Sequence, residues 1–542
     1  MTRGMTVKRA AIILCIPLFA AACGRSTEDT RTASAVDGEA IYTRNCASCH
    51  GPQGDGQGPA AYLLFPKPRN FQAANFKLRS TPQGSLPTDD DLRMTIRTGM
   101  PGTPMLGFAD LLSDAQIDGV IGYVKTFSPR FADAGPPAAD ELLAISEPPD
   151  VTPELVAEGR QAYGTMRCDQ CHGPEGRGDG PSAPTLRDSE GQPFPAADFT
   201  QGIYKSGGGA RELYRTMLTG MSGTPMPSYA DALQSERQAW AIVAYLESLA
   251  PGGQVRPAAG DPGPLSVATV ADEGLLGDPV AAGWGRLEPH RVYMRPLWYR
   301  SRYPLFVEIR VARVGDRLGL LLEWDDPSHD TATIGQQAFG DGVAVELSAA
   351  DPPPFVGMGA DPDGEVEIWF WRADRQHDAD ANAVTDMPDA HPDMAVDGYP
   401  FTRGLQPNEG GGAAEAFAAG QEAPFVSGRD VDNPVSQPEM LRRPVHTLRA
   451  AGLGTATAPG VPGQRATGRG IWTDGTYRVL ITAPLAPLPD VAGLDLTARQ
   501  TIPLAVAAWD GAAGDRNGTK LVSQWITLQL GAGGAASGPG GE

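Results

Sequence analysis

Four cysteines of this chain fall in two pairs, and a histidine follows each pair directly. The two runs are CASCH, residues 46–50, and CDQCH, residues 168–172. Thiols at this spacing can bond covalently to the two vinyl groups of one porphyrin, and the adjacent imidazole then lies against the iron. A disulfide or a zinc site is the alternative for a single motif. Two copies favour covalently bound haem c, held by Cys46, Cys49, His50, Cys168, Cys171 and His172.

The two motifs belong to a longer internal repeat. CASCHGPQGDGQGP, residues 46–59, aligns with CDQCHGPEGRGDGP, residues 168–181. Further on, RTGMPGTPMLGFADLLSD from Arg97 aligns with LTGMSGTPMPSYADALQS from Leu218. The offset stays at 121 or 122 residues, so the N-terminal half is a tandem duplication. Each copy is expected to form one small domain with one haem.

Each copy also offers a second iron ligand in the run TGMxGTPM. A methionine thioether is a soft donor that favours ferrous iron and suits an electron carrier. Met105 and Met226 lie in a proline-flanked loop just before the last helix of each copy, and we predict these two as ligands. Met100 and Met221 are the alternatives. For any one methionine, packing in the core is the other interpretation.

Helix signals surround these ligands. Ser113 with Gln116, and Ser235 with Gln238, form the pattern of a helix N-terminal capping box. Apolar residues follow at helical spacing, which predicts a helix packed on a core. These residues are Ile117, Val120, Ile121 and Val124 in the first copy and Ala239, Ile242, Val243 and Leu246 in the second. Short helices over 38–45 and 159–167 are expected to lead into the two CxxCH motifs.

Both copies resemble small class I cytochromes c. The resemblance covers about residues 36–129 and 151–251 and implies two small all-α domains. Proline-rich segments at 130–150 and 252–264 are expected to be linkers.

The pattern becomes strand-like from about residue 265. Short β-branched and aromatic runs such as LFVEIRVARV and TIPLAVAAWDG are bounded by Gly, Pro and Asp. They predict a mostly antiparallel β-sandwich or barrel over 265–532. An acidic, aperiodic segment from His377 to Pro400 is expected to be a long surface loop, and residues 533–542 a disordered tail.

The order of motifs in this half carries a second resemblance. EWDDP, FGDGVAVELS, PPPFVGMG, EVEIWFWRAD, GIWTDGTYRVLITAPL, IPLAVAAWDG and NGTKLVSQWITLQL follow one another. Together they resemble the haem-b-binding domain of the ethylbenzene dehydrogenase gamma-subunit family. The resemblance implies a non-covalent haem b held between Met358, in PFVGMG, and Lys520, in NGTKLVSQW. The alternative ligands are His290, His329, His377, His391 and His446, and Trp369, Phe370 and Trp371 are expected to pack the core.

Lys520 is the only lysine after residue 205. A lysine amine can bind iron once it is neutral, and burial lowers its pKa enough to allow this. A guanidinium keeps its proton, so arginine could not replace it. The other interpretation is an ordinary exposed lysine after a turn.

The N-terminus predicts export. Arg3, Lys8 and Arg9 precede the apolar run AAIILCIPLFAAAC, which has the length of a secretory signal. Three alanines before Cys23 resemble a bacterial lipoprotein processing site, with ordinary cleavage nearby as the alternative. Residues 1–35 are therefore expected to be a signal peptide and lipid-anchored tether, and the protein periplasmic. The formal net charge of −21 argues against nucleic acid as a partner.

Three haems with both axial positions filled have no vacant site for a substrate, so we expect an electron carrier without catalytic residues. The expected partners are an oxidoreductase, such as a molybdenum enzyme, and soluble cytochromes or a membrane oxidase. The alternatives are a dihaem peroxidase or oxidase, which needs a five-coordinate haem, and a haem-based sensor, which needs an output module.

Overall fold

The computed structural model describes most of the chain after residue 35. The described ranges are 36–135, 137–138, 141–250, 263–333, 337–357, 364–382, 437–489, 491 and 493–531. Cys23, Met358 and His391, together with the signal segment 1–35 and the expected tail 533–542, lie outside these residues. The chain divides into Met1–Val36 and Asp37–Glu542, and every helix and strand below belongs to the second unit. Within the described ranges no helix combines the length and apolar character needed to cross a bilayer.

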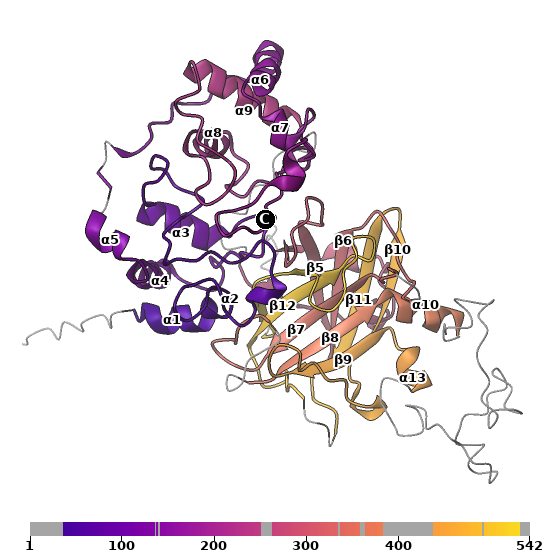
Figure 1. Cartoon of the computed structure of the whole chain (residues 1–542). Coiled ribbons are helices and arrows are strands. Elements are labelled where there is room, and N and C mark those ends of the chain that lie inside the picture. The colour runs from indigo at the N-terminus through magenta and orange to yellow at the C-terminus, as the bar shows by residue number, and fades with distance from the viewer. Residues whose placement is uncertain are drawn as a thin grey trace, which may run out of the picture. The chain divides into compact units, whose positions relative to one another are not determined.

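The first CxxCH motif belongs to a small helical domain (Figure 1). Its helices are α1 (Gly38–Asn45), α2 (Ala47–His50), α3 (Asp89–Thr98), α4 (Asp114–Thr126) and α5 (Pro129–Ala134). Ser113 caps α4 in a complete capping box, and the four predicted apolar residues of α4 are all buried. Helices α1 and α4 pack so closely that a Cβ at Gly38 would lie 2.0 Å from the carbonyl oxygen of Gly119. Helix α5 runs into the segment expected to be a linker.

The second CxxCH motif lies in a domain with the same order of elements. Its helices are α6 (Pro153–Thr165), α7 (Asp169–His172), α8 (Ala210–Thr219) and α9 (Glu236–Ser248). A Cβ at Gly159 of α6 would lie 1.8 Å from the carbonyl oxygen of Ala241 in α9, so glycine is required at this crossing. Ser235 caps α9, but the side chain of Gln238 accepts from Gln234 N rather than from the cap residue. The second capping box is therefore only half formed.

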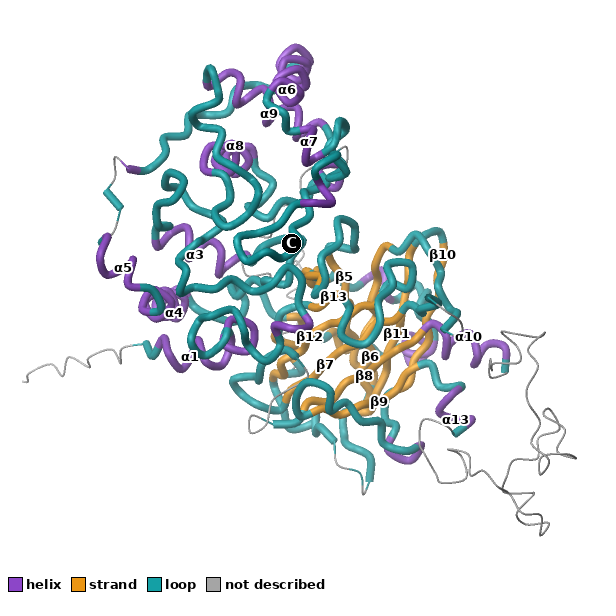
Figure 2. Tube along the Cα trace, viewed as in Figure 1, coloured by secondary structure: helices purple, strands orange, loops and turns teal. Residues whose placement is uncertain are grey.

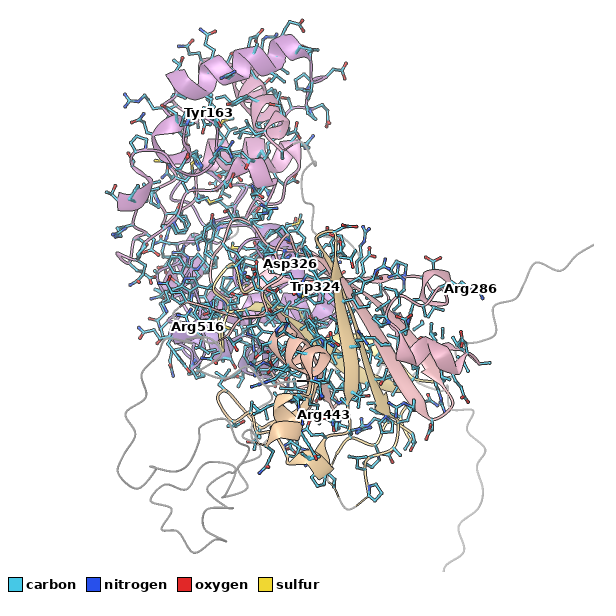
Figure 3. The ribbon with its side chains drawn as sticks, turned by 90° about the vertical axis from the view of Figure 1, so that its right-hand side faces the viewer. Tyr163, Arg286, Trp324, Asp326, Arg443 and Arg516 are labelled. Atoms are coloured by element: carbon cyan, nitrogen blue, oxygen red, sulfur yellow. The ribbon has the colours of Figure 1, made fainter. Side chains whose placement is uncertain are left out.

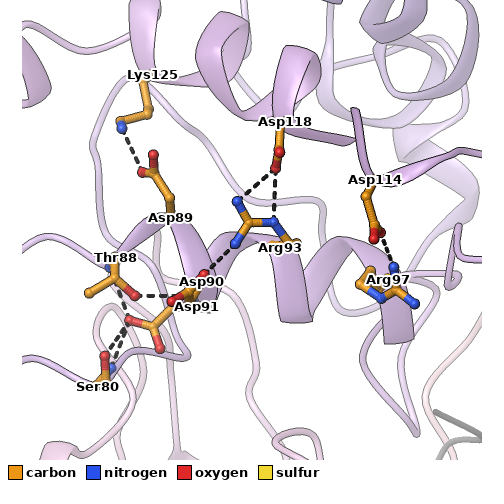
Figure 4. Close-up of polar contacts among 10 residues, drawn as sticks. All are labelled: Ser80, Thr88, Asp89, Asp90, Asp91, Arg93, Arg97, Asp114, Asp118 and Lys125. Carbon is orange, nitrogen blue, oxygen red and sulfur yellow. Dashed lines mark hydrogen bonds and ion pairs between the residues drawn. The ribbon is translucent and has the colours of Figure 1, made fainter. Parts of the chain in front are cut away.

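Polar contacts fix α3 against α4 in the first domain (Figure 4). Three ion pairs join the two helices: Lys125–Asp89, Arg93–Asp118 and Arg97–Asp114. Exposed pairs of this kind contribute little stability, but they select one helix register. Because α3 leads directly into the loop that carries Met100 and Met105, the pairs also orient that loop.

The C-terminal domain contains two sheets (Figure 2). The strands of the larger sheet run in the order β1 (Leu265–Ser266), β14 (Ile526–Gln529), β12 (Thr501–Trp509), β7 (Gly342–Ser348), β8 (Val366–Arg372) and β9 (Val445–Ala450), with β13 (Leu521–Val522) and β4 (Arg295–Pro296) at one edge. Those of the smaller sheet run β10 (Thr467–Thr473), β11 (Thr476–Pro484), β6 (Arg317–Asp325), β5 (Phe306–Val314) and β2 (Ala268–Thr269), with β3 (His290–Tyr293) paired to β5. All pairs are antiparallel except β1 with β14 and β2 with β5. Buried residues of both sheets form one shared core, which confirms the predicted fold class of two helical domains followed by an antiparallel sandwich.

Strand β8 separates its three consecutive aromatic residues. Trp369 and Trp371 are 0% and 1% exposed in the core between the sheets. Phe370 points to the opposite face, where its ring lies 4.6 Å from that of Trp509. Both tryptophans pack in the core between the sheets, as expected, and Phe370 packs against a second buried cluster, because successive side chains of a strand face opposite sides.

The acidic segment from His377 begins inside a helix. Residues 377–381 form the end of α10 (Ala373–Ala381), so the expected loop starts later than predicted. From residue 383 onward the segment lies outside the described ranges. A further short helix, α13 (Pro438–Leu441), precedes β9.

The first helical domain contacts the sheet domain directly. Phe65 N donates to Leu297 O at 3.0 Å, and Tyr299 N donates to Phe65 O at 2.7 Å. Gly102 N donates to the hydroxyl of Tyr303 at 2.9 Å. These contacts bring the methionine loop of the first domain against the sheet domain.

Candidate haem-binding sites

The histidine of the first CxxCH motif has one ring nitrogen available to bind a metal. His50 lies at the end of α2, and its Nδ1 is 3.0 Å from the carbonyl oxygen of Arg69. A carbonyl can only accept, so Nδ1 carries the proton and the lone pair of Nε2 remains for iron. The ring stacks on Phe71 at 4.4 Å. Burial lowers the pKa of His50 to about 4, which keeps the imidazole neutral.

The cysteines of both motifs are free thiols. Neither Cys46–Cys49 nor Cys168–Cys171 forms a disulfide. Burial raises the pKa of Cys46 and of Cys49 to about 12. Across the described ranges, neither motif joins a cluster of three or more groups able to hold a metal ion. The thiols are therefore available for covalent attachment, as predicted.

A cavity of about 630 Å³ opens beside the first motif. Cys46, Cys49 and His50 line it together with both methionines of the following loop, Met100 and Met105. Met100 N donates to Met105 O at 3.0 Å and closes that loop. The choice of Met105 over Met100 stays a prediction, since both side chains reach the same cavity.

The second motif repeats this arrangement on a smaller scale. His172 Nδ1 lies 3.0 Å from Ala197 O, and the ring stacks on Phe199 at 4.3 Å. Burial lowers the pKa of His172 to about 4. A cavity of about 150 Å³ is lined by Cys168, Cys171, His172, Met221 and Met226.

In each domain a buried tyrosine donates a hydrogen bond to the turn that follows the CxxCH motif. Tyr42 donates from its hydroxyl to Gly51 O at 2.7 Å, and Tyr163 donates to Gly173 O at 2.8 Å. Figure 3 labels Tyr163 within the second helical domain. In both domains the tyrosine ties the helix before the motif to the turn that follows the histidine, so the duplication preserves the support as well as the ligands.

The larger cavity continues into the sheet domain. Its far wall includes Phe370, Trp509, Phe355 and Gly357, and Lys520 lies in the same wall. The side chain of Lys520 is half-buried, with Nζ 4.9 Å from the centre of the Trp509 ring. The interpretation of Lys520 as an ordinary exposed lysine is therefore wrong.

Two opposing effects act on the charge of Lys520. Burial lowers its pKa, and the carboxylate of Glu346, which also lines the cavity, raises it. Burial is the larger effect, so the pKa of Lys520 is lowered from its usual value.

The remaining candidate ligands for the haem b iron are Met358 and the histidines of the sheet domain. Met358 lies outside the described residues, although Gly357 just before it lines the cavity. None of the described histidines of the sheet domain reaches the cavity. For example, His446 Nε2 bonds to Met440 O at 2.8 Å, and His329 stacks on Trp472.

Several lining residues were missed by reasoning from sequence. The positions of Phe370 and Glu346 in the cavity wall could be inferred from the alternation of side chains along β8 and β7, but only once the face covered by the second sheet is known. Lys77 and Lys205, one in each helical domain, also line cavities. The repeated pattern Phe-x-x-x-x-Phe/Tyr-Lys could have identified them.

Comparison with known proteins agrees with this geometry. The family model "Cytochrome c" matches residues 35–128 and 156–250. The chain is 30% identical over 265 residues to the dimethylsulfide dehydrogenase subunit gamma of Rhodovulum sulfidophilum, covering 47% of this chain and 75% of that subunit. It is 23% identical over 222 residues to the chlorate reductase subunit gamma of Ideonella dechloratans, covering 41% and 63%. It is also 29% identical over 169 residues to the thiosulfate dehydrogenase electron acceptor of Stutzerimonas stutzeri, covering 30% and 68%.

The two helical domains are cytochrome c domains, which carry covalent haem, so the protein is a multihaem cytochrome c. The chain belongs to the family of the dimethylsulfide dehydrogenase gamma subunit. The likeness of the sheet domain to the ethylbenzene dehydrogenase relatives in particular stays a prediction.

Proposed function

We propose that this chain is a periplasmic electron-transfer subunit with two c-type haems and one b-type haem. It relays electrons between a partner oxidoreductase and carriers of a respiratory chain. The names of its relatives support this role, since they include subunits of a dehydrogenase and a reductase and an electron acceptor. A molybdenum enzyme is the proposed class of partner, and soluble cytochromes or a membrane oxidase are the proposed carriers on the other side.

One observation carries the proposal. The cavity that contains His50 of the first cytochrome c domain also contains Lys520 of the sheet domain. Electron transfer between cofactors requires only close approach in a fixed orientation, and the protein supplies that orientation. A shared cavity favours direct exchange between the two cofactors.

The sheet side of the cavity fits a non-covalent haem. Its walls are mainly apolar, with Ile368, Phe370, Leu448 and Leu453 among the lining side chains. Lys520 would supply a nitrogen ligand to the iron, and Met358 is the proposed second ligand. When bound, the iron would supply one-electron chemistry. Burial in this wall lowers the pKa of Lys520, which favours coordination by the amine.

The proposal extends to the N-terminal segment. Residues 1–35 are proposed to direct export, and Cys23 to carry a lipid that holds the mature protein at a membrane. The other proposed domain limits are 36–129 and 151–251 for the cytochrome c domains and 265–532 for the haem b domain. Radiolabelled fatty acid incorporation, with Cys23→Ser as the negative control, tests the anchor.

The haem count tests the proposed function. Pyridine haemochrome spectra before and after acid-acetone extraction separate covalent from extractable haem. Two covalent haems and one extractable haem per chain are expected. Carbon monoxide added to the reduced holoprotein should bind little, because both axial positions are filled. A haem count of two without extractable haem would overturn the haem b site, and strong carbon monoxide binding would favour the enzyme alternative.

A further inference from the structure

Two lysines occupy equivalent places in the cytochrome c repeat. Lys77 ends the run Phe71-x-x-x-x-Phe76-Lys77, and Lys205 ends the run Phe199-x-x-x-x-Tyr204-Lys205. Each lysine lines the cavity of its own domain, beside the proximal histidine. The chain uses only six lysines against 38 arginines, so lysine at both positions is not a compositional default.

Both ammonium groups approach the same aromatic ring. Lys77 Nζ lies 5.4 Å from the centre of the Phe194 ring, and Lys205 Nζ lies 5.2 Å from it. Phe194 is buried and belongs to the second domain, whereas Lys77 belongs to the first. The two cavities therefore approach each other at Phe194. In agreement, Pro101 and Gly102 of the first domain line the cavity of the second.

Among the described residues, neither ammonium group is held in an ion pair. Throughout the described ranges, no hydrogen bond or ion pair is formed by the Nζ atom of Lys77 or of Lys205. Lys77 is 9% exposed and Lys205 is half-buried. Burial and the neighbouring cations Arg69 and Lys205 lower the pKa of Lys77, whereas the carboxylates of Asp188 and Glu190 oppose this effect. Neither carboxylate forms an ion pair with a lysine in the described ranges, so both ammonium groups keep their hydrogen-bond donors for an incoming anion.

Arg69 also lines the first cavity, and its buried Nε has no hydrogen-bond partner among the described residues, so it can bind an anion beside Lys77. Lys67, Arg300 and Arg167 are engaged or exposed. The ammonium of Lys67 donates to the carbonyl oxygens of Ala61 and Tyr62. Arg300 pairs with Asp515 at 2.5 Å, and Arg167 is exposed. Lys77 and Lys205 are thus the lysines left in the two cytochrome c cavities to meet an incoming anion.

We propose that Lys77 and Lys205 bind the propionate carboxylates of the first and second c haem. Each haem then turns its carboxylate edge toward Phe194, and the two c haems meet at this junction. Each haem has two carboxylates, which need cations once they leave water. The inference rests on haem occupancy of both CxxCH motifs. Under this proposal the first c haem lies between the second c haem and the proposed haem b site, because its cavity also reaches Lys520.

The test uses the haem-loaded, full-length protein. Lys77→Met and Lys205→Met remove the charge and keep the length of the side chain, whereas Lys77→Arg and Lys205→Arg keep the charge. Lys125→Met is the matched control, since it removes the same charge from Lys125 of α4, which pairs with Asp89 of α3. The measurements are the midpoint potential of each haem and the propionate bending band in the resonance Raman spectrum.

Each Met variant should shift its own haem toward the oxidised form, because a cation beside the haem favours the reduced, less positive iron. The expected shift is about tenfold in the redox equilibrium, or about 59 mV for one electron, together with a displaced propionate band. The Arg variants and Lys125→Met should stay near wild type. Loss of haem in a Met variant but not in its Arg counterpart would also support the need for a cation.

Two results would overturn the inference. One is a Met variant with complete covalent haem, an unchanged potential and an unchanged propionate band. The other is an Arg variant that shifts as far as its Met counterpart. Both leave the proposed relay intact, whereas a wild-type protein without covalent haem would contradict the relay itself.

Discussion

His50 and Lys520 line one cavity, although the first lies in a helical domain and the second in the sheet domain. The arrangement places a neutral imidazole at one end and a desolvated amine at the other. Two potential iron ligands of different domains thus face a common apolar space.

Replacement of Lys520 tests the proposed haem b site. Lys520→Ala should reduce the extractable haem more than about tenfold, since an axial bond worth well over about 1.4 kcal/mol is lost. Lys520→Arg should fail to restore it, because a guanidinium does not lose its proton. Acid-acetone extraction measures the effect. Lys67→Ala is the control, and equal extractable haem in Lys520→Ala and wild type would contradict the assignment.

Replacement of the methionines distinguishes the two candidates in the first cytochrome c domain. Met105→Leu should abolish the charge-transfer band of methionine-ligated ferric haem and lower the potential, because a soft donor to ferrous iron is lost. Met100→Leu should leave the band in place. Absorption spectra of the oxidised holoprotein provide the measurement. The opposite result would assign the ligand to Met100 and, by the repeat, to Met221.

Replacement of two glycines in α6 tests the packing of the second cytochrome c domain. Gly159→Ala should lower the free energy of unfolding by about 3 kcal/mol, because its Cβ would lie 1.8 Å from Ala241 O. Gly164→Ala is the matched control, since open space surrounds that position. It should raise the free energy of unfolding by up to about 1 kcal/mol, as alanine favours helix. Denaturant titration followed in the haem absorption measures both, and equal effects would contradict the close crossing of α6 and α9.

Stability of the sheet domain should depend on pH through a buried carboxylate. Burial, and then the nearby Asp341, raise the pKa of Asp326 from 3.8 to about 7. The folded chain therefore holds more protons than the unfolded chain between about pH 4 and pH 7, and the free energy of unfolding falls as pH rises through this window. Figure 3 labels Asp326 beside Trp324, the last but one residue of β6.

The variant Asp326→Asn should weaken this pH dependence. It keeps an acceptor for the backbone and hydroxyl of Ser328 but removes the charge. We expect a gain of about 1–2 kcal/mol at pH 8 and little change at pH 4. Chemical denaturation across this range, with a chelator present, gives the profile. Asp325→Asn changes an exposed neighbour and serves as control, and a profile parallel to wild type for Asp326→Asn would contradict the mechanism.

The sequence by itself determined the features that depend on near neighbours in the chain. The CxxCH motif places thiols and imidazole within one turn of helix, so its chemistry is visible without a fold. The cap at Ser113 and the apolar residues of α4 were likewise predictable, because both arise from local hydrogen bonding and helical periodicity. The short β-branched and aromatic runs after residue 265, bounded by Gly, Pro and Asp, likewise predicted the sandwich.

Only the tertiary structure decided which of these residues share a cavity. That Phe370 faces the cavity while Trp369 and Trp371 face the core depends on which side of β8 the second sheet covers. That Lys77 reaches Phe194 of the other domain depends on how the two repeats pack. Contacts between residues distant in the chain follow from the packing of whole domains, which no local pattern encodes.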